Sequence, residues 1–193
     1  IWPFFQNLWF SFNDVNKFNV SHFVGLENYK NILTDMTIWR SFGNTLKYVV
    51  ITVPVGLFFS IVLAALLNAG IKGKSLYRTL YFLPSVTMSA AVAMVWKWVF
   101  NEQMGILNSF IKKLGGTGHN WLTDPHTALY MIMIVGLWMS VGYNMIILLA
   151  GIQGISKSYY EAAAIDGATA IDQFFHITMP MLTPSIFFVT ITS

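Results

Sequence analysis

The sequence predicts an all-α, polytopic membrane protein, and three observations lead to that prediction. Hydrophobic residues make up 55% of the 193-residue chain and charged residues only 10%, whereas a soluble domain carries roughly 25% charged residues. A helix needs about 20 mostly apolar residues to cross a bilayer, and three apolar runs reach that length, at about 42–67, 77–100 and 128–150. The chain also lacks cysteine, which excludes structural disulfides and thiolate metal sites.

Two further apolar runs, one at each end, are too short to cross. Residues 1–12 are rich in Trp and Phe, which is typical of the outer end of a first transmembrane helix; a free amphipathic peptide is the alternative. Residues 13–41 are polar and predict an outer loop. Pro184 suits the first turn of a helix, where its missing N–H costs nothing, so a last span is expected from 184. We expect the chain to be truncated at both ends.

The connections between the spans carry the orientation signal. The short loop at 68–78 contains three basic residues and should face the cytoplasm. Basic residues are about equally numerous in the loops on the two sides, so the total decides nothing. Residues 101–126 predict a second outer loop. Pro54 and Gly56 interrupt the first span, which membrane helices tolerate where neighbours satisfy the freed backbone groups.

A polar helix-turn-helix is predicted between the last two apolar runs. Ser158 followed by Glu161 is a capping-box pattern, so a helix should begin there. Gly167 can adopt the positive φ that ends a helix and turns the chain. Thr169 and Asp172 repeat the start signal, and the second helix should stop near Met179, because Pro180 disfavours helical geometry in the residue before it.

This segment resembles the EAA loop of the membrane subunit of binding-protein-dependent ABC importers. The matching positions are Glu161-Ala162-Ala163, Asp166-Gly167-Ala168, Phe174, Ile177, Pro180, Leu182 and Pro184. The resemblance implies that residues 42–193 form a type I ABC importer transmembrane domain and that the loop at 156–182 is cytoplasmic. It further implies that the first helix docks on an ATPase subunit. The implied contact residues are Glu161, Ala162, Ala163, Asp166 and Gly167.

Segments 23–29, 77–84 and 120–125 resemble the carbohydrate-uptake branch of that family, and its first permease subunit, of the maltose and glycerol-phosphate type. The resemblance implies a multi-pass permease of the bacterial inner (cytoplasmic) membrane that imports a sugar or related solute. The implied partners are two ATPase subunits, which bind ATP and Mg²⁺, a second similar permease, an external solute-binding protein and the lipid bilayer. A phosphate-bearing substrate would favour extra cations in the pathway, and Lys97 is the best candidate in the spans present, so a neutral sugar or oligosaccharide is favoured.

Each of these residues also has a plainer interpretation. Glu161 could only cap its helix, and Ala162 and Ala163 could be plain helix formers. Asp166, near the negative end of the helix dipole, favours an external partner. Trp138, Tyr143 and Asn144 offer aromatic faces and an amide that suit a sugar pathway, but such side chains also pack membrane helices together. Lys97, flanked by two Trp residues, could reach the outer interface or contact the substrate.

Other functions are disfavoured by missing patterns. No acidic residue lies inside a complete predicted span, which argues against a proton-coupled carrier. A secondary transporter or channel remains the alternative, and a membrane-embedded enzyme would need paired catalytic groups that the spans lack. No phosphate-cradling Gly-rich motif is present, so we expect ATP hydrolysis on a separate subunit. Scattered basic residues do not indicate nucleic-acid binding. His119, Asp124 and His126 lack metal-ligand spacing and are expected to be solvated loop residues.

Overall fold

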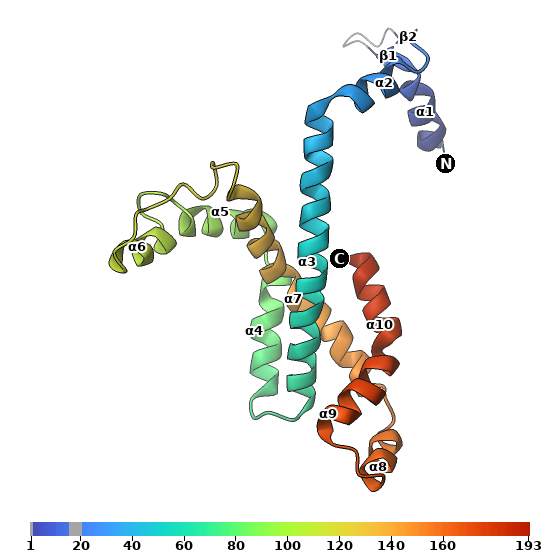
Figure 1. Cartoon of the computed structure of the whole chain (residues 1–193), viewed down its shortest axis with the longest axis vertical. Coiled ribbons are helices and arrows are strands. Elements are labelled where there is room, and N and C mark those ends of the chain that lie inside the picture. The colour runs from blue at the N-terminus through green and yellow to red at the C-terminus, as the bar shows by residue number, and fades with distance from the viewer. Residues whose placement is uncertain (1, 16–20) are drawn as a thin grey trace. The chain divides into compact units, whose positions relative to one another are not determined.

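The computed structural model describes residues 2–15 and 21–193, and Ile1 and residues 16–20 lie outside the described part (Figure 1). The chain divides into two compact units, Ile1–Lys47 and Tyr48–Ser193, and the division falls inside the long helix α3 (Met36–Asn68). Most of the described chain is helical, which confirms the predicted fold class.

The first unit holds more structure than the predicted loop over 13–41. Its elements are α1 (Trp2–Ser11), an antiparallel ribbon of β1 (Asn13–Val15) and β2 (Ser21–Phe23), α2 (Glu27–Thr34) and the start of α3. Asn28 Nδ2 donates to the carbonyls of Ser11 and Asn13 at 3.0 and 3.1 Å, and Tyr29 Oη lies 2.7 Å from Ser11 Oγ. These bonds tie α2 to the ribbon. The part of the predicted loop at 16–20 lies outside the described residues.

The second unit is a helical bundle. Its elements are the rest of α3, α4 (Lys74–Val86), α5 (Ser89–Val99), α6 (Ile106–Lys113), α7 (Ala128–Gln153), α8 (Lys157–Ile165), α9 (Ala170–Gln173), the π-helix η1 (Phe174–Thr178) and α10 (Met179–Thr192). Its core lies between α3, α7 and α10. The buried core residues are Ala64, Leu67, Met145, Leu148, Leu149, Ile152, Leu182 and Val189.

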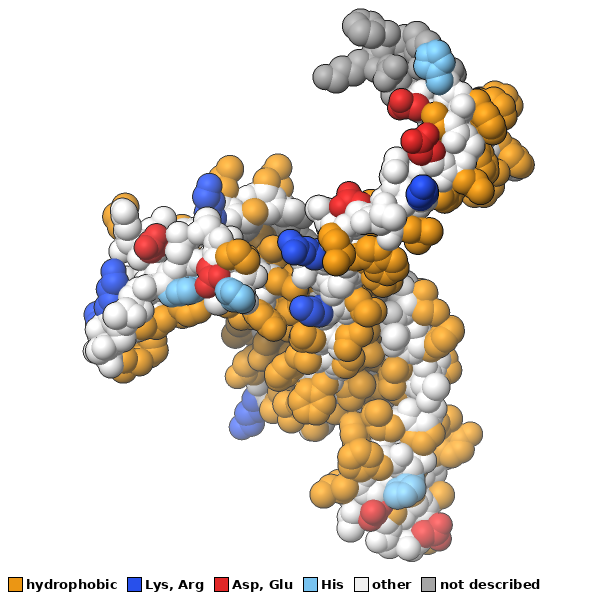
Figure 2. All heavy atoms as spheres, turned by 45° about the horizontal axis from the view of Figure 1, so that its top comes forward, with side chains coloured by type: hydrophobic (Ala, Val, Ile, Leu, Met, Phe, Trp, Pro, Cys, Tyr) orange, Lys and Arg blue, Asp and Glu red, His pale blue; other side chains and the backbone are white. Residues whose placement is uncertain are grey.

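Among the described residues, three helical segments are long and apolar enough to cross a membrane, namely 36–68, 128–153 and 170–192. The first two overlap the spans predicted at 42–67 and 128–150. Figure 2 shows hydrophobic side chains over the visible face of the helices, with charged side chains set around them. Such a surface is suited to lipid or to another apolar partner rather than to water.

The span predicted over 77–100 is not one continuous helix. The structure has α4 and α5 here, bent by 97° at a short break, so together they form a broken span or a re-entrant segment. Pro84 removes one backbone donor near the end of α4. Thr87, already extended at ψ 141°, donates its hydroxyl to the Leu83 carbonyl at 2.8 Å. A side chain therefore takes the carbonyl that a continuing helix would use.

The predicted stop near Met179 and new start at Pro184 are also wrong. Residues 170–192 run on as α9, η1 and α10, with Pro184 inside the last helix. The turn before Pro180 is a π-turn, in which the Met179 N–H reaches the Phe174 carbonyl five residues back. A proline ring clashes with the carbonyl four residues before it in an α-helix, and the wider π-turn relieves that clash without ending the helix.

Candidate functional site

The polar helix-turn-helix begins at α8, two residues before the predicted start. The N-cap is Ser156 rather than Ser158, and its side chain accepts from the Ser158 N–H at 3.4 Å. Glu161 therefore lies in the second turn of α8, too far along to reach back to the N-cap. The predicted capping box of Ser158 and Glu161 is wrong, and the interpretation of Glu161 as only a cap falls with it.

The turn after α8 follows the prediction. Gly167 has φ +82°, and the N–H groups of Ala168 and Gly167 donate to the carbonyls of Ala163 and Ala164 at 2.9 and 3.1 Å. This pair of bonds is a Schellman motif, which closes a helix with a left-handed residue. The chain reverses at Gly167, and α8 meets α9 through a short, defined turn.

The second helix starts on a full capping box. Thr169 Oγ1 accepts from the Asp172 N–H at 3.3 Å, and Asp172 Oδ2 accepts from the Thr169 N–H at 2.9 Å. Of the two predicted helix starts, the second, at Thr169 and Asp172, is thus the one that forms a capping box. Because α9 continues into α10, this cap is also the first end of a helix that runs to Thr192. We predict that this end faces the cytoplasm.

The predicted contact residues share α8 and its turn but differ in exposure. Glu161, Ala162, Asp166 and Gly167 are exposed, whereas Ala163 is half-buried. Ile165, which the sequence analysis did not single out, is 87% exposed and shares the outer side of α8 with them. A large apolar side chain this exposed on a polar segment indicates a contact surface. The only sequence signal for this exposed apolar residue was its position directly after three alanines.

The two carboxylates of this surface have no cationic partner within the described residues, where the one ion pair joins His119 to Asp124. Glu161 and Asp166 therefore carry negative charge without an ion-pair partner beside the apolar Ile165 side chain. Asp166 is the C-cap of α8, where the helix dipole adds to that negative potential. A basic partner surface would complement it.

The three predicted pathway residues of α7 lie on different faces. Trp138 lines a cavity of about 430 Å³ between α3, α4 and α7, and its ring packs edge-on against Trp96 at 5.6 Å between centroids. Asn144 is only 5% exposed and donates to Ser193 Oγ at 3.2 Å. Tyr143 is 50% exposed on a third face. The structure does not bring the three together.

Asn144 instead belongs to a small polar recess of about 50 Å³ between α3, α7 and the end of α10. Its polar lining consists of Tyr48, Thr52, Ser140, Asn144 and Ser193. A liquid water occupies about 30 Å³, so this recess has room for a water or a single hydroxyl group rather than a sugar ring. The recess was not foreseen, because its residues come from three segments far apart in the sequence.

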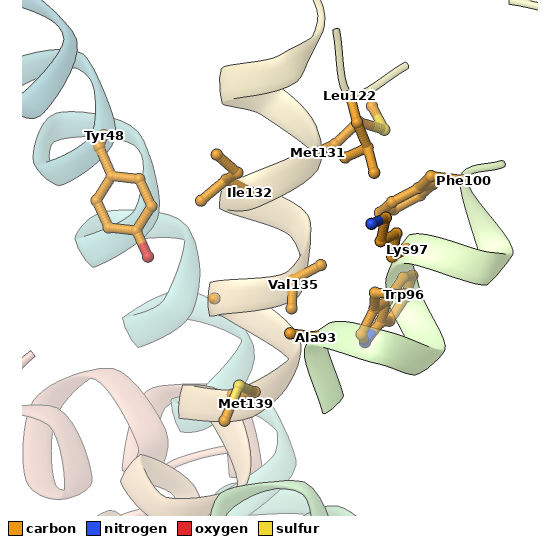
Figure 3. A pocket seen from close by; sticks show the side chains of 11 residues that line it. Tyr48, Ala93, Trp96, Lys97, Phe100, Leu122, Met131, Ile132, Val135 and Met139 are labelled. Carbon is orange, nitrogen blue, oxygen red and sulfur yellow. The ribbon is translucent and has the colours of Figure 1, made fainter. Parts of the chain in front are cut away.

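Lys97 lies in the last turn of α5 and lines a larger cavity of about 400 Å³. Figure 3 shows its side chain beside Trp96 of α5 and the following Phe100, with Val135 on the near side of α7 and Ile132 on the side of α7 that lies toward Tyr48. The lining of this cavity thus brings Lys97 together with the aromatic residues Trp96 and Phe100. Both interpretations of Lys97, as an interfacial residue and as a substrate contact, stay open.

The segment between α5 and α7, predicted to be an outer loop, is organised by one buried residue, Asn108 of α6. Its Nδ2 donates to the carbonyls of Asn101, Glu102 and His119 at 2.8–3.2 Å. Its Oδ1 accepts from the His119 N–H at 3.0 Å and from Trp121 Nε1 at 2.9 Å. Asn108 is 0% exposed and is satisfied on both ends of its amide. The predicted loop therefore has a fixed internal fold.

His119 and Asp124 form an ion pair in this loop, with Nε2 and Oδ2 2.8 Å apart. The other carboxylate oxygen of Asp124 accepts the His126 N–H at 2.9 Å. That backbone bond, followed by the His119 side chain, holds the pKa of Asp124 below its usual 3.8. Both carboxylate oxygens of Asp124 thus bind groups of the same loop. His119, Asp124 and His126 therefore stabilise a turn, although they are also accessible to solvent.

Comparison with known proteins identifies the same family over most of the chain. A family model described as "Binding-protein-dependent transport system inner membrane component" matches residues 36–193. The chain is 38% identical to the probable ABC transporter permease protein YesP of Bacillus subtilis, covering 96% of this chain and 60% of that protein. It is 34% identical to the sn-glycerol-3-phosphate transport system permease protein UgpA of Pectobacterium atrosepticum, covering 100% of this chain and 65% of the relative. The chain thus spans less than two thirds of these relatives.

The fold is also found in solved structures. A bacterial ABC transporter involved in the import of the acidic polysaccharide alginate matches with a TM-score of 0.85 at 22% identity, covering 96% of this chain and 63% of that one. The alginate transporter in complex with a pentasaccharide-bound periplasmic protein matches with a TM-score of 0.83 at 23% identity. At this level of identity the likeness shows the fold alone.

Proposed function

This chain belongs to the family of inner membrane components of binding-protein-dependent transport systems, and on that basis we propose that it is part of a permease subunit of an ATP-driven importer. The solute is a sugar or a related compound delivered by an external binding protein. The names of the relatives support this class, since they include a glycerol-phosphate permease and a probable ABC permease. A second, similar permease completes the pathway, and two ATPase subunits bind ATP and Mg²⁺.

The observation that carries the proposal is the exposed surface of α8. Glu161, Ala162, Ile165 and Asp166 are all exposed there, and we call them the α8 outer face. Small Ala162 permits close approach of a partner backbone, Ile165 supplies apolar area, and the two carboxylates select a basic partner. Gly167 fixes the angle of the turn, and Ala163 backs the face from its half-buried side. This composition fits a groove on an ATPase subunit.

The connection between α8 and the membrane supports the same mechanism. The turn at Gly167 leads directly into the continuous helical run 170–192, whose Leu182 and Val189 are fully buried in the core. A rigid helix packed into the core passes a displacement of its end to the bundle. Closure of the ATPase pair would therefore move α8 and, through this helix, the spans around the solute pathway.

For the pathway itself we propose Asn144 as a hydrogen-bonding residue and Trp138 and Tyr143 as aromatic surfaces. The recess beside Asn144 already collects hydroxyl groups in an apolar bundle, which is an environment that can bind one hydroxyl of a solute. Asn144→Ala should raise the half-saturation concentration for uptake, and Tyr143→Ala should lower uptake. Normal uptake in both variants would leave these residues as packing groups.

The proposal is tested by crosslinking in native membranes. We would introduce Ala162→Cys into an otherwise cysteine-free full-length protein, with Ser109→Cys on exposed α6 as the matched control. The expected result is a nucleotide-sensitive crosslink from position 162 to a protein of ATPase size and none from position 109. A position-162 thiol that reagents reach from the cytoplasm but that never crosslinks would refute the ATPase contact. Glu161→Ala should weaken assembly or transport and leave membrane insertion intact.

A further inference from the structure

Helix α8 makes few contacts with the rest of the described chain. None of its residues is buried, and its two ends are a short connection from α7 and the turn at Gly167. Within the described residues, one side-chain hydrogen bond joins α8 to the spanning helix. Tyr160 Oη lies 2.9 Å from Thr178 Oγ1. We call this pair the Tyr160–Thr178 tie.

Thr178 stands at a sensitive place in the spanning helix. It is the last residue of the π-turn, it is only 6% exposed, and it lies two residues before Pro180. Its hydroxyl donates to the Gln173 carbonyl at 3.4 Å. A threonine hydroxyl has a single proton, so Tyr160 must then be the donor to Thr178. The phenol of α8 is thus linked through Thr178 to the backbone of the π-turn.

The space around the tie is hollow rather than packed. A cavity of about 280 Å³ lies between the ends of α3 and α7 and the π-turn, and its lining includes Asn68, Ile152, Tyr160, Gln173 and Thr178. Close-packed interiors resist displacement because contacts are lost when they shift, and an open cavity removes that resistance. Helix α8 is therefore held by the tie and by its two ends, with room to move behind it.

We propose that Tyr160 and Thr178 are positioning residues that pass the movement of α8 to the spanning helix. The inference rests on the proposed function, because it takes the α8 outer face as the ATPase contact. The tie enters the spanning helix at its π-turn, where the regular hydrogen-bond ladder is already altered and local rearrangement costs least. Loss of the tie should leave the ATPase bound while weakening the link between hydrolysis and transport.

The test compares Tyr160→Phe, Thr178→Val, the double variant and Thr178→Ser in the full-length protein, assembled with its partners in proteoliposomes. Each of the first two removes one hydroxyl at nearly constant volume, and Thr178→Ser keeps the hydroxyl. Tyr159→Phe and Thr183→Val are the matched controls, since both side chains are exposed and make no such bond to the other helix. Solute uptake, ATP hydrolysis and the crosslink from position 162 are measured together.

We expect Tyr160→Phe and Thr178→Val each to lower the uptake per ATP hydrolysed about two- to tenfold, the range that matches the net strength of one hydrogen bond. The double variant should be no worse than Thr178→Val alone, because Tyr160→Phe removes only the bond that Thr178→Val has already broken. Thr178→Ser and the controls should retain normal coupling. Unchanged coupling, additive losses, or a Thr178→Ser variant as defective as Thr178→Val would overturn the inference. An absent crosslink from position 162 would overturn the proposed function as well. A normal crosslink with unchanged uptake per ATP hydrolysed would overturn only the role of the Tyr160–Thr178 tie.

Discussion

The packing of α7 against α3 and α4 makes a graded prediction about three glycines. At Gly142 a Cβ atom would overlap the Tyr81 carbonyl oxygen of α4 and lie 2.5 Å from its carbonyl carbon, where ordinary contact begins near 3.4 Å. Both obstacles are backbone atoms, so no side chain can turn away. Gly142→Ala therefore forces the two helices apart.

The size of the effect follows from that geometry. Separating packed helices to admit one methyl group costs about 1–3 kcal/mol, and sometimes more, while alanine regains about 0.5–1 kcal/mol of helix propensity. We expect Gly142→Ala to destabilise the bundle by about 2 kcal/mol. At Gly56 of α3, in contrast, the nearest atom to a new Cβ is Leu137 Cδ2 at 3.4 Å. Gly56→Ala should therefore be neutral or stabilising by up to about 1 kcal/mol.

Gly136→Ala is the intermediate member of the series. Its Cβ would overlap the hydroxyl end of Tyr48, which is a side chain that can rotate aside at a smaller cost. The assay is the apparent Tm of each purified full-length variant, because 1 kcal/mol corresponds to about 2–4 °C for a chain of this size. The expected order of Tm is Gly56→Ala highest, Gly136→Ala next and Gly142→Ala lowest. A Gly142→Ala protein as stable as Gly56→Ala would refute the close approach of α4 and α7.

Three further predictions concern the loops. Gly167→Ala should lower the crosslinking yield from position 162, because alanine at φ +82° costs about 1–2 kcal/mol with no clash involved, and Gly167→Asn should recover part of the loss. Asn108→Ala removes the acceptor of the His119 N–H and of Trp121 Nε1 and should open the loop between α5 and α7 to protease, whereas Ser109→Ala should not. The lowered pKa of Asp124 means that its contribution to loop order is complete above pH 3.8 and is lost as the pH falls through the lower folded value. As the solution is acidified, amide exchange in this loop should therefore speed up relative to exchange in loops without a titrating side chain. Asp124→Asn should abolish that pH dependence. An unchanged pH dependence in Asp124→Asn would contradict the role of Asp124.

The local signals in the helix-turn-helix show how far the sequence could be interpreted. Gly167 was predicted because a left-handed turn needs glycine, and the structure uses it in that way. The box of Thr169 and Asp172 was also predicted, and the structure forms it. The start of α8 was misplaced by two residues, because Ser156 and Ser158 both can cap and only the path of the preceding chain selects one.

The two prolines show where local rules failed. The sequence analysis ended a helix at Met179 because of Pro180, whereas the structure continues the helix through Pro180 and instead interrupts the predicted span 77–100 between Val86 and Ser89, shortly after Pro84. At Pro180 the buried Leu182 and Val189 anchor the following helix in the core, so a π-turn that keeps the helix is cheaper than a break. Helix α4 ends at Val86, two residues after Pro84, where the Thr87 hydroxyl donates to the Leu83 carbonyl.

The sequence by itself determined the properties that depend on neighbouring residues. These are the helical membrane class, from the length of the apolar runs, and the turn at Gly167 with the capping box of Thr169 and Asp172, from a dense local pattern. Only the tertiary structure decided which side of α8 is exposed, that Asn144 faces a polar recess, that Tyr160 reaches Thr178, and that α4 touches the backbone of α7 at Gly142. The physical reason is that each of these depends on contacts between segments far apart in the chain, and packing in three dimensions selects among local conformations that differ by only about 1–3 kcal/mol.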